Sequence, residues 1–134
     1  MPTREAKVKE FMRAVGQDIG QEFSEDLIDL RWRLLKEEVD ELQYALYHVL
    51  YDMTYGDGEP KPSTVENLLK EMSDVQYTLS GMAVAFGLPL VNAFNRVHES
   101  NMSKFNDDGR PDYDDHGKVI KGPNYQPPFL GDLI

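Results

Sequence analysis

The sequence predicts an all-α fold, a four-helix bundle followed by an irregular C-terminal tail. Apolar residues recur at helical spacing in four separate segments, and glycine, proline or capping residues stand between these segments. After Lys104 the composition changes to proline, glycine and aspartate with isolated aromatic residues, and no period is visible. A chain of 134 residues suits one domain. We therefore expect a helical domain over residues 1–104, and over residues 105–134 a tail or lid of the same domain.

The first two helices are predicted from apolar periodicity and from the residues at their ends. Four apolar residues have the i, i+3, i+4, i+7 spacing of one helical face: Val8, Phe11, Met12 and Val15. Gly16 and Gly20 then interrupt the pattern. Ser24 is the expected N-cap of the second helix, because acidic residues follow it in the first turn. This helix should run to about Met53, before the glycines of residues 56–58.

The third and fourth helices follow from similar signals. Residues 63–66, Ser-Thr-Val-Glu, have the capping-box spacing, which predicts that the third helix begins there. Gly87 should close that helix, and Pro89 stands where a fourth helix would begin. The fourth helix is expected to run to roughly Lys104.

The totals restrict the function. A formal net charge of -10 disfavours nucleic acid and anionic membranes as partners. The absence of cysteine excludes disulfides and thiolate metal sites. Residues 1–10 lack an apolar signal core, and residues 75–95 read as a buried helix with a break rather than a membrane span. We expect a soluble, cytoplasmic protein. A phosphate-bearing ligand would need a local cluster of cations.

Acidic residues stand on the second helix where its pattern calls for apolar ones. On a helical wheel, one face carries the following apolar residues: Leu27, Leu30, Leu34, Leu42, Ala45 and Val49. Glu38 lies near the middle of this face, Glu41 lies on the same stripe, and Glu37 lies at its edge. Asp40 points away and should be solvated.

The third helix shows the same anomaly. Glu71 and Asp74 flank its main apolar face and share their stripe with small residues such as Gly81, which indicates a closely packed neighbouring helix. No charged residue follows Asp74 before Arg96. Several ionised carboxylates facing one core are costly without a compensating cation. An all-oxygen ligand set favours Mg²⁺ or Mn²⁺, whereas zinc prefers His or Cys.

Two other interpretations of the acids compete with a magnesium site. The carboxylates could form ion pairs with Arg31, Arg33 or Lys36, or line a wet surface. A di-iron bundle needs a Glu-x-x-His pair on each of two helices, and no histidine in this chain has a glutamate three residues before it.

The acidic motifs carry a family resemblance. Glu-Glu-x-x-Glu at residues 37–41, followed by Glu-x-x-Asp at residues 71–74, resembles the signature of the MazG-like all-α nucleoside triphosphate pyrophosphohydrolases. That superfamily includes the dimeric dUTPases and the phosphoribosyl-ATP pyrophosphohydrolases. Residues 97–104 and 117–122 resemble the phosphoribosyl-ATP pyrophosphohydrolase-like branch. The likeness covers roughly residues 5–130.

The resemblance implies roles for individual residues. The metal ligands would be Glu38, Glu41, Glu71 and Asp74. Glu37 would ligate a second ion or take the proton of the attacking water, so that Glu37 and Glu38 are the expected catalytic pair. Asn101 and Lys104 would contact the nucleotide. The tail residues Lys118, Lys121 and Tyr125 are candidates to close over the phosphates, the alternative being that these lysines are simply solvated.

By this resemblance the protein hydrolyses a nucleoside or deoxynucleoside triphosphate to the monophosphate and pyrophosphate, with Mg²⁺ as cofactor and Mn²⁺ able to substitute. The resemblance implies that the shorter phosphoribosyl-ATP enzymes end soon after the fourth helix, whereas this chain has about 30 further residues that need a role of their own. We therefore expect a role in nucleotide-pool control. The alternatives are a phosphoribosyl-ATP pyrophosphohydrolase of histidine biosynthesis and a non-catalytic acidic helical binding module. A homodimer or dimer of dimers is expected, because the first helix and the tyrosines of the second offer more apolar surface than four short helices bury.

Overall fold

The computed structural model describes all 134 residues and contains four α-helices, one short 3-10 helix and no β-strand. The helices are α1 (Arg4–Val15), α2 (Glu25–Tyr55), α3 (Pro62–Ala85) and α4 (Leu90–Met102), and the 3-10 helix η1 covers Gly131–Leu133. The prediction of an all-α fold with four helices and an irregular tail is therefore confirmed. The chain divides into two compact units, Met1–Leu88 and Pro89–Ile134, each described by itself below. No single helix is long and apolar enough to cross a membrane, although α3 and α4 taken together pass that test by length and composition only.

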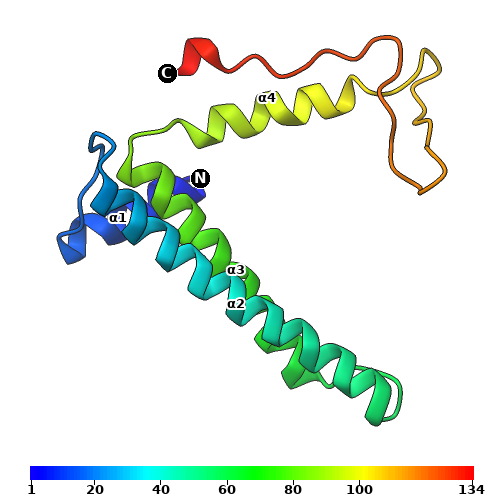
Figure 1. Cartoon of the computed structure of the whole chain (residues 1–134), viewed down its shortest axis with the longest axis horizontal. Coiled ribbons are helices and arrows are strands. Elements are labelled where there is room, and N and C mark those ends of the chain that lie inside the picture. The colour runs from blue at the N-terminus through cyan, green and yellow to red at the C-terminus, as the bar shows by residue number, and fades with distance from the viewer. The chain divides into compact units, whose positions relative to one another are not determined.

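The first unit is a long hairpin of α2 and α3 with α1 packed against α3 (Figure 1). The Thr3 hydroxyl accepts a hydrogen bond from the Ala6 amide at the start of α1, and Gly16 ends that helix with a φ of 75°. The core of this unit joins α1 to the end of α3 through four apolar residues: Val8, Met12, Val84 and Ala85. Because this core lies at one end of the hairpin, the rest of α2 and α3 is supported mainly by contact with each other.

Helix α2 begins as predicted. The Ser24 hydroxyl accepts a hydrogen bond from the Leu27 amide at 3.2 Å, with Glu25 and Asp26 in the first turn. The helix runs to Tyr55, two residues past the predicted end, and stops at Gly56.

The predicted start of α3 was wrong. The helix begins at Pro62 rather than within residues 63–66, and no side chain of its own caps it. A proline ring presets the φ angle of the first helical turn and has no N–H to leave unpaired, so Pro62 suits this position. The capping role passes to Asp52 on α2. Its buried carboxylate accepts hydrogen bonds from the Lys61 amide at 3.0 Å and from the Thr64 hydroxyl at 2.6 Å.

Small residues let α2 and α3 approach closely. Gly81 is buried on α3, and a Cβ atom added there would lie 3.2 Å from Nη1 of Arg31 on α2. Other residues of low volume are buried on the two helices as well, namely Ala45 on α2 and Ser80, Ala83 and Ala85 on α3; of these, Ala85 belongs to the core shared with α1, and the Ser80 hydroxyl donates a hydrogen bond to Glu5 on α1. The small stripe of α3 therefore faces a neighbouring helix, as its sequence predicts, and the acidic residues that share it are drawn close to α2.

The second unit consists of α4 and a tail that is irregular yet fixed to it. Figure 1 shows the C-terminal segment running back along α4. The Ser100 hydroxyl donates a hydrogen bond to the Gln126 carbonyl at 2.7 Å, and the Gln126 amide donates to Ser103 Oγ at 2.9 Å. Nearer the C-terminus, Arg96 forms a two-pronged ion pair with Asp132. The tail is therefore held at two places on one face of α4.

A four-carboxylate candidate metal centre

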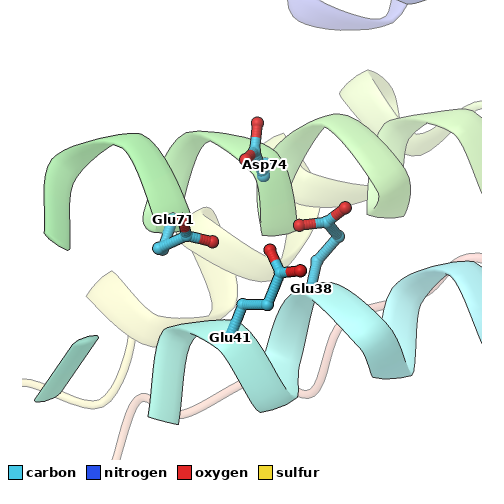
Figure 2. Close-up of side chains that lie close together, drawn as sticks. All are labelled: Glu38, Glu41, Glu71 and Asp74. Carbon is cyan, nitrogen blue, oxygen red and sulfur yellow. The ribbon is translucent and has the colours of Figure 1, made fainter. Parts of the chain in front are cut away.

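Four acidic side chains converge between α2 and α3. One carboxylate oxygen from each residue lies within 4.8 Å of those of the other three: Glu38, Glu41, Glu71 and Asp74. Figure 2 shows Glu38 and Glu41 rising from α2 toward α3, with the two α3 acids opposite. Each helix supplies its pair at the i, i+3 spacing, which puts both carboxylates on one face. The antiparallel hairpin then sets the two pairs against each other.

The environment of this carboxylate cluster is graded from buried to exposed. Glu71 is buried, Glu38 and Asp74 are half-buried, and Glu41 is exposed. The cluster therefore has a protein wall on one side and an opening to solvent on the other. Such an opening is required if an ion and a phosphate chain are to reach the carboxylates.

Two oxygen atoms in the cluster have no partner. Glu38 Oε2 and Glu71 Oε2 are buried and make no hydrogen bond. Loss of solvent raises the pKa of Glu38 above its ordinary 4.5, and the charges of Glu41 and Asp74 raise it further. The cluster is therefore short of positive charge. Unpaired buried carboxylate oxygens, with no nitrogen or sulfur among the donors, fit a hard divalent cation such as Mg²⁺ or Mn²⁺.

The one cation that contacts the cluster is Lys70, which the sequence analysis missed. Its ammonium lies 3.2 Å from Glu71 Oε1 and 3.0 Å from Asp74 Oδ2. These hydrogen bonds, with the carboxylate charges behind them, raise the pKa of Lys70 above its ordinary value. The i, i+4 spacing of Lys70 and Asp74 on one helix was the available signal.

The cations of α2 are engaged elsewhere, so ion pairs with them do not explain the cluster. Arg33 pairs with Asp29 at 3.1 Å and Lys36 with Asp40 at 2.9 Å, both on the exposed surface. Asp40 is thus solvated, as predicted. Arg31 forms no salt bridge; it is buried, which lowers its pKa, and its Nε has no partner.

The structure does not bring Glu37 into the group of four; Glu37 is exposed at the position of α2 just before Glu38. The other predicted site residues lie in the second unit. Asn101 is exposed near the end of α4, and Lys104 is half-buried, with its carbonyl accepting a hydrogen bond from the Gly122 amide at 2.8 Å.

The three predicted tail residues lie in the turns after α4. Lys118 and Lys121 are exposed. The ammonium of Lys121 stands 4.8 Å from the ring centre of half-buried Tyr125, so these two form a cation–π pair. Arg96, for which the sequence predicted no role, anchors the tail through the Phe129 carbonyl and the Asp132 carboxylate.

The family model described as phosphoribosyl-ATP pyrophosphohydrolase matches residues 8–101. This match contains all four carboxylates of the cluster and spans most of the chain. A search of curated proteins finds no match. The family is divalent-metal dependent and supports nucleotide pyrophosphohydrolase activity in general. With four helices, no strand and paired carboxylates on the middle two helices, the chain belongs to the phosphoribosyl-ATP pyrophosphohydrolase family of the MazG-like all-α nucleoside triphosphate pyrophosphohydrolases.

Proposed function

We propose that the protein is a Mg²⁺-dependent pyrophosphohydrolase that converts a nucleoside or deoxynucleoside triphosphate to the monophosphate and pyrophosphate, in the service of nucleotide-pool control. The observation that carries this proposal is the cluster of four carboxylates with two unpaired buried oxygens. A structural role alone does not account for it, because like charges held this close oppose folding.

The four carboxylates would hold the divalent cation: Glu38, Glu41, Glu71 and Asp74. Bound there, Mg²⁺, or Mn²⁺ in its place, would neutralise phosphate oxygens and favour in-line attack by water. Glu37 is exposed beside the cluster and is our choice for the base that accepts the proton of that water. The oxygen of water forms a bond to the α-phosphorus, and the bond from this phosphorus to the pyrophosphate oxygen breaks.

Residues of the second unit would bind the nucleotide. Asn101 offers an exposed amide near the end of α4, and Lys104 follows three residues later in the turn after that helix, so both side chains are close enough in the chain to contact one ligand. Lys121, held against the Tyr125 ring, and Lys118 supply exposed cations in the tail for the phosphate chain.

The second candidate substrate is phosphoribosyl-ATP, which the description of the matching family favours. We prefer a nucleoside or deoxynucleoside triphosphate because the tail after α4 is held against that helix through Gln126, Phe129 and Asp132. A tail that is held in place needs a role, and covering a small triphosphate is one such role.

The test is a panel of nucleoside triphosphates, deoxynucleoside triphosphates and phosphoribosyl-ATP, each incubated with Mg²⁺ in heavy-oxygen water. We expect monophosphate and pyrophosphate as first products, with the heavy oxygen in the monophosphate. Label in pyrophosphate would place the attack at the β-phosphorus. A nucleoside diphosphate with orthophosphate as first products would contradict the proposal, and absence of turnover on every compound would favour a non-catalytic acidic module.

We also propose a homodimer or a dimer of dimers. The hairpin of α2 and α3 leaves large apolar side chains exposed along α2, for example Trp32, Tyr44, Tyr47 and Tyr51. Only six apolar residues of the whole chain are buried. An apolar surface of this kind is typical of a subunit interface. Light scattering that shows a monomer at micromolar concentration would contradict this assembly.

A further inference from the structure

Lys70 contacts the carboxylate cluster in an unequal way. Its ammonium binds one oxygen of Glu71 and one of Asp74, both on α3, and reaches neither acid of α2. The Lys70 side chain is 64% exposed, whereas that of Glu71 is 8% exposed. An exposed cation is therefore attached to one buried carboxylate, Glu71, and to one half-buried carboxylate, Asp74.

A divalent cation held by the four carboxylates would share Glu71 and Asp74 with the ammonium of Lys70. The two unpaired oxygens are Glu38 Oε2 on α2 and Glu71 Oε2 on α3, so each helix contributes one oxygen without a partner. Two positive charges placed on these carboxylates would repel the ammonium of Lys70, which lies 3.2 Å from Glu71 Oε1 and 3.0 Å from Asp74 Oδ2. The long, flexible stem of a lysine lets it leave such a contact at little cost.

Resting on the proposed function, we propose that Lys70 is an exchangeable counter-cation of the metal centre. In the metal-free protein it neutralises the α3 carboxylates, and it gives up Glu71 and Asp74 when the divalent cation binds. Its freed ammonium then stands beside the cluster, where it binds a phosphate group of the substrate. One residue thus limits metal binding before the nucleotide arrives and contributes to nucleotide binding afterwards.

The experiment compares Lys70→Met with Lys36→Met. Lys36 is a matched control, because it also pairs with an aspartate four residues later, its side chain has similar exposure, and it does not contact the cluster. Titration calorimetry with Mg²⁺ alone, at one pH and without nucleotide, gives the metal affinity of each folded variant. Losing a surface-exposed ammonium contact should tighten Mg²⁺ binding by about three- to fivefold in Lys70→Met, with no change in Lys36→Met.

The second readout is steady-state kinetics at saturating Mg²⁺. We expect the KM for the nucleotide to rise in Lys70→Met while kcat changes less, and Lys70→Arg to restore KM because it keeps the charge. If Lys70→Met binds Mg²⁺ no more tightly than the Lys36 control, the exchange is refuted while the proposed metal site stands. If the unmodified protein itself binds no divalent cation, both the proposed function and this inference fail.

Discussion

Replacing Glu38 with glutamine separates the chemistry of the carboxylate cluster from the stability of the fold. The change removes one negative charge and keeps the shape of the side chain. Glu38 has an oxygen within 4.8 Å of three other carboxylates, and a pair of unit charges at that distance repels by about 0.9 kcal/mol even at the dielectric constant of water. Lys70 offsets part of this repulsion at Glu71 and Asp74. We therefore expect the metal-free variant to be more stable by about 1–2 kcal/mol.

The pH dependence gives a second expectation for the same variant. The pKa of Glu38 is raised above its ordinary 4.5 in the folded protein, chiefly by loss of solvent. Between the unfolded-state pKa of Glu38 and its higher folded-state pKa, the folded protein therefore binds more protons than the unfolded chain. This contribution to the free energy of unfolding falls as pH rises through the folded-state pKa. Metal-free Glu38→Gln should lose that part of the dependence, so the gain over the unmodified protein should be larger at neutral pH than near pH 4.5.

The assays are thermal melting with and without Mg²⁺ and a turnover measurement. Turnover should fall by orders of magnitude in Glu38→Gln, and the stabilisation conferred by Mg²⁺ should shrink, because it reports binding to the folded state. Glu66→Gln on the exposed surface of α3 is the control and should change neither quantity. A strongly destabilised Glu38→Gln with near-normal activity per folded molecule would refute the metal-ligand role and indicate a structural carboxylate.

Three further predictions concern other parts of the chain. Asp52→Asn should lower the melting temperature by a few degrees. Because hydrogen bonds lower the pKa of Asp52 in the folded protein, the stabilising effect of this carboxylate should be lost as pH falls through the folded pKa. Melting curves of both proteins across acidic pH test the two statements. Arg96→Met should release the end of the tail from α4, so that limited proteolysis cuts after residue 122 faster than in the unmodified protein; equal rates would mean that the ion pair with Asp132 does not hold the tail. Lys104→Met should raise the KM for the nucleotide several-fold with little loss of stability, and an unchanged KM would remove Lys104 from the substrate site.

The sequence alone predicted what depends on local periodicity. Helix α2 and its Ser24 cap follow from residues within one or two turns of each other, and the inward side of Glu38 follows from the 3.6-residue repeat. The pairing of acids across two helices could be inferred as well, because each pair lies on or beside an apolar face that must be buried.

Contacts between residues distant in the sequence were out of reach. Thr64 lies inside the predicted capping box of residues 63–66, but its hydroxyl donates a hydrogen bond to Asp52, twelve residues earlier, and no side chain of α3 caps the helix. The sequence did not predict the role of Arg96, because its partner Asp132 lies 36 residues later. The course of the tail depends on such pairings, and no period in the sequence encodes them.

The Asp52 contact has a consequence for how the hairpin tolerates change. Asp52 lies about four helical turns, or ~21 Å, along α2 from Glu38, and it fixes the first turn of α3 directly. The alignment of α2 against α3 is therefore set by a side chain that stands outside the connecting loop. Residues inserted between Gly56 and Pro60 should bulge into solvent and leave the four carboxylates opposite one another. Longer or shorter connections at this point are thus compatible with one and the same site, and this loop is where the chain can accept a graft or a label.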